Sequence, residues 1–233
     1  EQKTIFGVVR DITDLIEAED RNAAVNEKLR VVGKITRHDV RNKFAIINSA
    51  TYLLRKKIGD NAEAEKYLSM IESAVAMSNR LFEFSRLYES IGAEEQTKID
   101  VYRCFNEAVT LASNLEKIEI INQTEGLIVV ADSLLRQIFY NFIDNSIKHG
   151  KKVTQIKFYY TKYKDQIKLY YEDNGIGVSQ ENKPRLFTEG FTTGDGTGLG
   201  LAIMKKIMDV YGWKIDELGK PGKGAKFEII IPK

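Results

Sequence analysis

Two glycine clusters near the C-terminus contain residue types that suit a nucleotide site. The first is Asp173-Asn174-Gly175-Ile176-Gly177, which follows an apolar run, and the second spans residues 194–200 and opens a predicted helix. Glycine is needed where the backbone approaches a ligand closely or takes a positive φ. A glycine-rich loop before a helix also offers free N–H groups to phosphate. One cluster alone would indicate only a turn, but two with a loop between them predict a nucleotide pocket with a lid.

A polar helix face precedes these clusters. Asn141, Asn145 and Lys148 are spaced at i, i+4 and i+7, so they share one face of a predicted helix over residues 133–148. Amide oxygens can bind Mg²⁺, amide groups can bind phosphate, and Lys148 supplies positive charge. By itself this pattern is typical of a solvated surface. The glycine clusters downstream favour a ligand-binding face instead.

A candidate nucleophile, His38, lies in a second region of the chain. It falls about 200° around the predicted helix from Val40 on the apolar stripe, so we expect it to face solvent. Neutral imidazole is abundant at pH 7, with a reference pKa of about 6.5, and can attack phosphorus. Asp39 can hold the ring tautomer and take up its proton; the alternative is a surface charge paired with Arg41 or Lys43. Asn42 lies on the same face as His38 and can orient water.

Long helices must position His38. The first 183 residues contain no proline, and helical periodicity runs from about residue 11 to 58 and again from about 62 to 88, with a turn at residues 59–61. The first helix would be about 65–70 Å long at 1.5 Å per residue. Because the apolar faces are too broad for one hairpin to bury, we predict a dimeric four-helix bundle.

The pattern changes after Gly92. Short apolar runs near residues 117–122, 127–130, 155–160, 166–172, 213–218 and 225–231 alternate with helical stretches near 101–115, 133–148 and 198–211. This order predicts an α+β sandwich with helices on one face of a mixed sheet. We therefore divide the chain into an N-terminal segment that includes the start of the long helix (1–16), a helical domain (17–94) and an α/β sandwich domain (95–233).

These motifs carry a family resemblance. The segment from about residue 97 to 233 resembles the catalytic ATP-binding domain of sensor histidine kinases, whose fold is shared with DNA gyrase, mismatch-repair ATPases and heat-shock chaperones. Residues 141–145 look like the N box, 173–177 the first glycine box and 194–200 the second. Residues 185–193 resemble the phenylalanine box of the ATP lid. All four boxes occur in the family's order.

The resemblance implies a role for each motif residue. Asp173 would accept a hydrogen bond from the adenine amine, and Asn141 would bind Mg²⁺. Arg185 or Lys183 would neutralise γ-phosphate charge from the lid, with Arg185 taken as the candidate, and His149 would form a pocket wall. The remaining residues would contact the base or the phosphates: Asn145, Lys148, Gly175, Gly177, Gly196, Thr197, Gly198, Leu199 and Gly200.

One substitution separates kinase from hydrolase. ATP hydrolysers of this fold typically begin the N box with a glutamate that activates water, and here Asn141 stands in that position. An amide has no useful basicity, so the pocket should hold ATP as a phosphodonor. The alternatives are an ATP-driven conformational clamp of the same fold, which needs the missing glutamate, and a scaffold with a decayed site, which the intact boxes disfavour.

Joined to this domain, residues 37–42 resemble the H box of the dimerisation and histidine-phosphotransfer domain. The resemblance implies that His38 is autophosphorylated from ATP–Mg²⁺ and passes the phosphoryl group to an aspartate of a response regulator. It also implies that Asn42 serves phosphatase activity toward that aspartate. One residue departs from the family pattern: Lys43 stands where a proline often bends the helix.

Composition limits the other functions. A formal net charge of +2 gives no basic footprint for nucleic acid. The single cysteine, Cys104, fits a reducing compartment, and with only two histidines a Cys/His zinc site is disfavoured. No window is apolar enough to span a bilayer. We expect a cytoplasmic fragment without membrane contact, whose parent protein could be membrane-anchored, and a PAS-type sensor domain ending near residues 7–14.

Overall fold

The computed structural model describes residues 13–59, 61–194 and 197–232. Its internal contacts divide the chain into two compact units, residues 1–79 and 80–233. The expected end of a sensor domain, at residues 7–12, lies outside the described residues. No helix among those described is long and apolar enough to cross a membrane.

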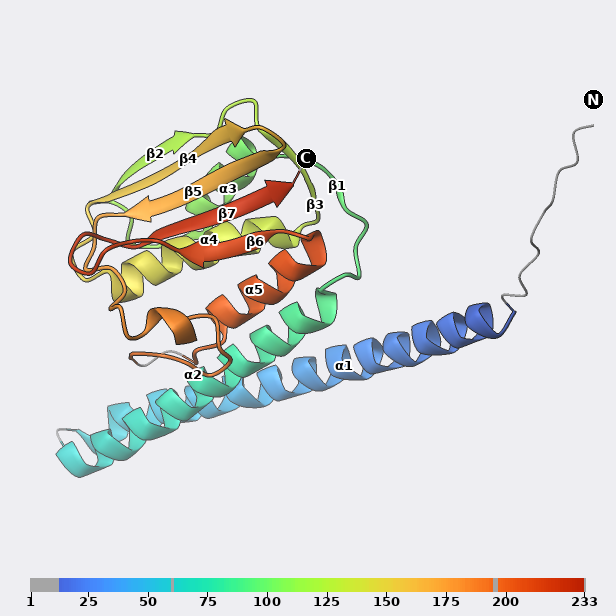
Figure 1. Cartoon of the computed structure of the whole chain (residues 1–233). Helices are drawn as coiled ribbons and strands as arrows, with labels where there is room; N and C mark the ends of the chain where they lie inside the picture. The colour runs from blue at the N-terminus through green and yellow to red at the C-terminus, as the bar shows by residue number, and fades with distance from the viewer. Residues whose placement is uncertain (1–12, 60, 195–196, 233) are drawn as a thin grey trace, which may run out of the picture. The chain divides into compact units, whose positions relative to one another are not determined.

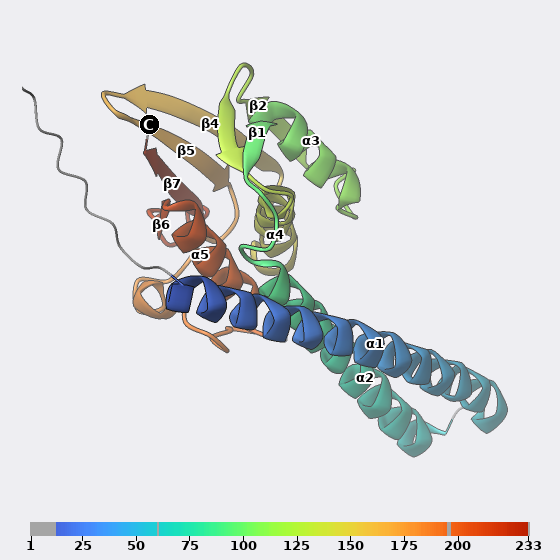
Figure 2. The same ribbon diagram turned by 90° about the vertical axis from the view of Figure 1, so that its right-hand side faces the viewer.

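The first unit contains helix α1 (Thr13–Ile58) and most of helix α2 (Ala62–Ser90), which run antiparallel on either side of a short connection (Figures 1 and 2). Gly59 takes a φ of +56° at this connection. The side chain of Asn61 then caps α2 by accepting a hydrogen bond from the Ala64 N–H at 3.1 Å. Arg55 near the end of α1 pairs with Glu65 and Glu72 of α2, each at 2.9 Å. These contacts set the register of the two helices.

The two helices bury only part of their apolar surface. Thr51, Leu68 and Val75 are buried, whereas Ile46 is 63% exposed and Met70 is 60% exposed. Further large apolar side chains exposed on these helices are Ile47, Tyr52, Leu53, Leu54, Tyr67, Ile71 and Met77. Apolar surface of this extent on a helix pair is typical of a face that meets another protein chain.

The second unit is an α+β sandwich, as predicted. Its main sheet has the strand order β2-β4-β5-β7-β6, with bounds β2 Glu119–Gln123, β4 Gln155–Tyr163, β5 Gln166–Asp173, β6 Lys214–Glu217 and β7 Lys226–Pro232. Strands β2 and β4 are parallel and the other neighbours are antiparallel. Helices α3 (Val101–Leu111), α4 (Leu134–His149) and α5 (Gly200–Tyr211) lie on the same side of this sheet (Figures 1 and 2).

The core lies between this sheet and the three helices. The Phe105 and Phe158 rings stack at 4.2 Å, and Phe139 meets Phe158 edge-on at 4.9 Å. Closer to the end of β5, Phe142 of α4 stacks on Tyr171 at 5.0 Å. Because side chains alternate along a strand, the residues between the buried ones face away from the helices.

A charged network covers that outward face. Glu172 accepts a hydrogen bond from the Tyr159 hydroxyl at 2.5 Å and pairs with Lys226. Burial favours the neutral carboxyl, but the bonds from Lys226 and Tyr159 outweigh it, and the pKa of Glu172 is lowered. Glu228 in turn holds Lys168 at 3.1 Å. The charges on this face are therefore largely paired with one another.

Two details of the second unit differ from the sequence prediction. A short strand, β1 (Thr97–Asp100), pairs antiparallel with β3 (Ile128–Ala131). The sequence has no apolar run at β1, so this strand was not predicted. Helix α3 ends at Leu111 rather than near residue 115, because Ala112 is extended and Asn114 takes a φ of +64°. Phe84, Leu87 and Ile91, which follow residue 79 in the chain, also pack against the core of this unit.

Candidate functional site

The Asp173 carboxylate at the end of β5 is held by three donors. The backbone N–H groups of Gly175 and Ala225 donate to Oδ1 at 2.9 and 3.0 Å. The Ser146 hydroxyl of α4 donates to Oδ2 at 2.5 Å. These bonds fix an oriented hydrogen-bond acceptor where the sheet meets α4. Sequence reasoning identified Asp173 but missed Ser146 and Ala225 as its supports.

The first glycine cluster is packed too tightly for other residues. A Cβ on Gly175 would lie 2.7 Å from the Gly150 carbonyl oxygen, and one on Gly177 would lie 2.6 Å from that of Gly224. Gly177 also takes a φ of +67°. These glycines therefore allow the chain beyond Asp173 to lie against the end of α4 and the loop between β6 and β7.

That loop, residues 218–225, is a part of the site that sequence reasoning missed. Gly224 takes a φ of +97°, and a Cβ there would lie 1.8 Å from the Asp173 carbonyl oxygen. The Asp173 N–H donates to the Ala225 carbonyl at 3.0 Å, and the Gly222 N–H donates to the Ile176 carbonyl at 2.7 Å. The available signal was three glycines, at 219, 222 and 224, which look like an ordinary hairpin turn in the sequence.

The polar face of α4 places its three candidate residues differently. Asn141 is half-buried, and its Oδ1 accepts a hydrogen bond from Gln137 at 3.3 Å. Nδ2 of Asn145 is buried and has no hydrogen-bond partner among the described residues. Lys148 is exposed and pairs with Asp144 at 2.6 Å. The face thus offers an amide oxygen, an unpaired amide donor and a surface ammonium.

The second glycine cluster lies against the loop that precedes it. Gly198 takes a φ of +67°, and a Cβ there would meet the backbone of Gly190 and Phe191 at 2.4 and 2.5 Å. Leu199 precedes α5 without a side-chain cap, so the first-turn N–H groups have no side-chain acceptor from that residue. Thr197 and Leu199 are half-buried, and Gly200 begins the helix. The expected contact at Gly196 lies outside the described residues.

His149 lies beside this second cluster. Its Cε1 is 4.0 Å from the position that a Cβ on Gly194 would take. The imidazole is exposed at the C-terminal end of α4. The structure thus brings the end of α4 close to the start of the second cluster, although these residues lie 45 positions apart.

The two candidate lid cations have different partners. Lys183, in the short helix η1 (Lys183–Arg185), pairs at 2.7 Å with the buried Glu217 carboxylate and donates to the Gly219 carbonyl. Arg185 is exposed, and its guanidinium lies 5.0 Å from the Phe191 ring centre. The ammonium group of Lys183 therefore stabilises the β6–β7 loop. Arg185 is the better candidate for the cation that contacts a ligand.

The same segment also contacts helices. Glu189 pairs at 2.9 Å with Lys206 of α5, and Lys206 donates to the Tyr88 hydroxyl at 3.1 Å. The hydrogen bonds to Glu189 and Tyr88 raise the pKa of Lys206. This contact fixes one point of the segment between the two glycine clusters against α5.

His38 lies on α1 with an exposed ring, as predicted. The side chain is 73% exposed, and its Nδ1 lies 3.3 Å from Asp39 Oδ1 and 3.5 Å from Asn42 Nδ2. Both neighbours therefore approach the same ring nitrogen. Helix α1 continues unbroken through Lys43, the residue that replaces the family's usual proline.

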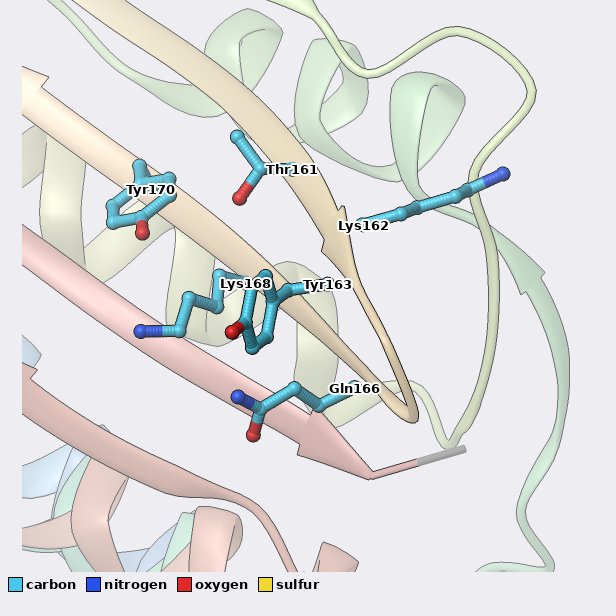
Figure 3. Close-up of a pocket in the computed structure, with 6 residues that line it drawn as sticks. All are labelled: Thr161, Lys162, Tyr163, Gln166, Lys168 and Tyr170. Carbon is cyan, nitrogen blue, oxygen red and sulfur yellow. The ribbon is translucent and has the colours of Figure 1, made fainter.

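A separate hollow of about 350 Å³ lies at the β4–β5 hairpin (Figure 3). It is lined by Thr161, Lys162, Tyr163, Gln166, Lys168 and Tyr170. Gln166 begins β5 and Asp173 ends it, so this hollow lies at the opposite end of the strand from the carboxylate. It is distinct from the site described above.

Comparison with known proteins shows which families and folds this chain is similar to. The family of histidine kinase-, DNA gyrase B- and HSP90-like ATPases matches residues 131–233. The signal transduction histidine-protein kinase AtoS of Escherichia coli K12 is 28% identical over 240 residues, which cover 97% of this chain and 38% of AtoS. The chain thus spans well under half the length of that curated relative.

Two solved structures share the fold. Full-length ShkA in complex with AMPPNP superposes with a TM-score of 0.61 at 24% identity, over 86% of this chain and 45% of ShkA. Histidine kinase ThkA in complex with the response regulator TrrA superposes with a TM-score of 0.57 at 24% identity, over 96% of this chain and 68% of ThkA. The likeness extends to the helical part as well as to the sandwich.

Proposed function

We propose that this chain transfers the γ-phosphoryl group of ATP to His38. The ground is that it carries the ATP-binding catalytic domain of the sensor histidine kinases. The phosphoryl group then passes to an aspartate of a response regulator. The observation that carries this proposal is the Asp173 carboxylate, an acceptor held in place by three donors, one of them Ser146 of the helix that also bears the half-buried Asn141. The names of the relatives favour a kinase over the ATP-driven clamp.

Nucleotide binding divides between side chains and backbone. Asp173 accepts the adenine amine, while Gly175 and Gly177 let the backbone approach the ring. Asn145, whose buried amide donor has no partner in the described part of the chain, and Lys148 meet the phosphates. His149 forms a wall of the pocket. The backbone of residues 197–200 surrounds the phosphates at the start of α5, and Arg185 adds positive charge from the lid.

The residues present fit a magnesium ion held mainly by the nucleotide. Mg²⁺ usually takes one or two protein oxygens, with waters and phosphates completing its octahedron. Asn141 Oδ1 is such an oxygen, and no cluster of three or more His, Cys, Asp or Glu side chains occurs among the described residues. When bound, the ion would neutralise charge that develops on the phosphates.

His38 is arranged to attack through Nε2. The Asp39 carboxylate can only accept, so its contact at 3.3 Å favours the tautomer with the proton on Nδ1 and the lone pair on Nε2. Asn42 Nδ2 would favour the other tautomer, but its contact is longer, at 3.5 Å. Asp39 therefore holds the reactive tautomer, and Asn42 remains available to orient water in the phosphatase direction.

The helical unit functions as a homodimer in this proposal. Exposed apolar residues such as Ile46, Leu53 and Met70 would pack against a second copy in a four-helix bundle. A light-scattering mass of two chains is expected, and a mass of one chain at micromolar concentration would contradict the bundle. An upstream sensor domain and a receiver domain complete the set of partners.

Labelling with γ-³²P-ATP and Mg²⁺ tests the transfer. We expect acid-labile, alkali-stable label on the protein, absent from His38→Ala. His149→Ala removes the other histidine, and because that residue borders the proposed pocket its labelling could be slower, but the label that it carries should remain acid-labile. Label of equal stability and amount on His38→Ala would rule out the proposed acceptor.

A further inference from the structure

Behind the Asp173 carboxylate lies a buried tyrosine that the proposed chemistry does not use. Tyr171 is 1% exposed, and its hydroxyl lies 2.8 Å from Ser146 Oγ. Ser146 Oγ in turn lies 2.5 Å from Asp173 Oδ2. The three groups form a continuous chain of hydrogen bonds from the core to the pocket.

The direction of this chain follows from the donors present. A carboxylate only accepts, so the single Ser146 proton points to Asp173. Ser146 Oγ must then accept from the Tyr171 hydroxyl. Burial raises the pKa of Tyr171 well above its ordinary value, so the phenol keeps its proton at physiological pH. Stacking on Phe142 at 5.0 Å holds the ring in place.

This hydrogen-bond chain leaves one acceptor position on Asp173 without a donor from the described part of the protein. A carboxylate has about four lone-pair positions, and three are used by Gly175 N–H, Ala225 N–H and Ser146 O–H. Two of these donors occupy Oδ1, so the remaining position lies on Oδ2, next to Ser146. That position accepts an amino group and repels a carbonyl oxygen.

We propose that Tyr171 is a specificity-determining positioning residue, which acts through Ser146 to hold Asp173 Oδ2 as an acceptor for 6-amino purines over 6-oxo purines. This inference rests on the proposed binding of ATP at Asp173. Without the Tyr171 hydroxyl, Ser146 Oγ loses its donor and can turn its own proton away from Asp173. The oriented acceptor is then partly lost.

The test compares the affinities of ATP and inosine triphosphate, which carries a 6-oxo group, by calorimetry. It uses the full chain with His38→Ala so that no transfer occurs. We expect Tyr171→Phe to weaken ATP binding about three- to tenfold, the effect of one hydrogen bond, and to leave the affinity for inosine triphosphate nearly unchanged. Tyr170→Phe is the matched control: it removes a hydroxyl that donates to Glu228 on the outward face, and should change neither affinity.

A second variant separates positioning from packing. Ser146→Ala should lower the ATP preference at least as much as Tyr171→Phe, and the double variant should equal Ser146→Ala, because Tyr171 acts only through Ser146. Equal weakening of both nucleotides in Tyr171→Phe, or additive losses in the double variant, would overturn the proposal. If Tyr171→Phe does not fold, Ser146→Ala is the test that remains. An unchanged preference of Ser146→Ala for ATP over inosine triphosphate would also overturn the proposal.

The outcome is separable from that of the kinase proposal. A lost ATP preference without label on His38 in the parent chain would keep the positioning role and remove the transfer. Label on His38 with an unchanged preference would keep the transfer and remove the positioning role.

Discussion

The Asp173 carboxylate and the His38 imidazole, the two groups at the centre of the proposed reaction, have opposite surroundings. Asp173 is held by three donors within 3.0 Å, from α4, its own turn and the β6–β7 loop. His38 is 73% exposed and has two contacts of 3.3 and 3.5 Å, both from its own helix. One site is built by tertiary packing and the other by a single helix.

This difference matches two different tasks. A pocket that selects a base benefits from an acceptor that is fixed before the ligand arrives. A phosphoacceptor that must meet both a donor and a second protein needs an accessible ring, and its neighbours need only favour one tautomer of that ring. The most damaging substitutions should therefore cluster around Asp173, and substitutions around His38 should change reactivity without changing stability.

The largest effect is expected from Asp173→Asn. The amide directs its NH₂ either at the N–H donors of Gly175 and Ala225 or into the position proposed for the adenine amine, so we expect at least about a 100-fold loss of ATP affinity, near 3 kcal/mol. Calorimetry with AMPPNP–Mg²⁺ measures it. The matched variant Asp165→Asn, in the β4–β5 hairpin at the other end of β5, should bind AMPPNP with the affinity of the parent chain. Similar affinities for Asp173→Asn and the parent chain would remove the acceptor role.

The next effect compares two glycines of the β6–β7 loop. Both take positive φ, +97° at Gly224 and +78° at Gly222, but only Gly224 has no space for a Cβ. Gly224→Ala should lower the free energy of unfolding by about 3–5 kcal/mol, and Gly222→Ala by about 1 kcal/mol. Urea unfolding measures both. Equal losses would mean that the loop does not clamp Asp173.

A third comparison sharpens the assignment of the lid cation. Lys183→Met leaves the buried Glu217 carboxylate without its cation and should cost about 3 kcal/mol of stability. Arg185→Met, at an exposed position, should leave stability nearly unchanged and slow labelling of His38. Thermal unfolding and initial labelling rates distinguish them. A stable Lys183→Met variant with slow labelling would reverse the assignment.

The smallest effect is a pH dependence on the outward face. The folded-state pKa of Glu172 is lowered, so the carboxylate stabilises the fold above its unfolded value of 4.5 and loses this contribution as the pH falls through the folded value. Glu172→Gln should cost about 0.5–1 kcal/mol at pH 7. The difference from the parent chain should shrink below pH 4.5. The same substitution at the exposed Glu125, outside this network, is the matched control.

Much of this architecture could be predicted from the sequence, because local sequence patterns determine it. The absence of proline before Pro184 indicated the long helices, and apolar runs indicated β4, β5 and β7 within a few residues. The exposed position of His38 followed from helical spacing alone. The four boxes pointed to Asp173 and the α4 face because each is a contiguous motif.

The remaining details depend on contacts between distant residues. Ala225 supports Asp173 from 52 positions away, and nothing in its local sequence distinguishes it from a hairpin residue. The choice between Lys183 and Arg185 depends on Glu217, whose burial only the packed sheet reveals. Strand β1 has a polar sequence and exists because β3 offers a partner.

The most direct test of the account counts products. In the presence of ATP and Mg²⁺, ADP and phosphate on the peptide containing His38 are quantified together, by chromatography and by mass spectrometry under alkaline conditions. A pocket that holds ATP for an exposed histidine predicts one ADP formed for each phosphohistidine, with both reaching a plateau. Continuous ADP production without phosphate on His38 would contradict the account and assign the pocket to hydrolysis.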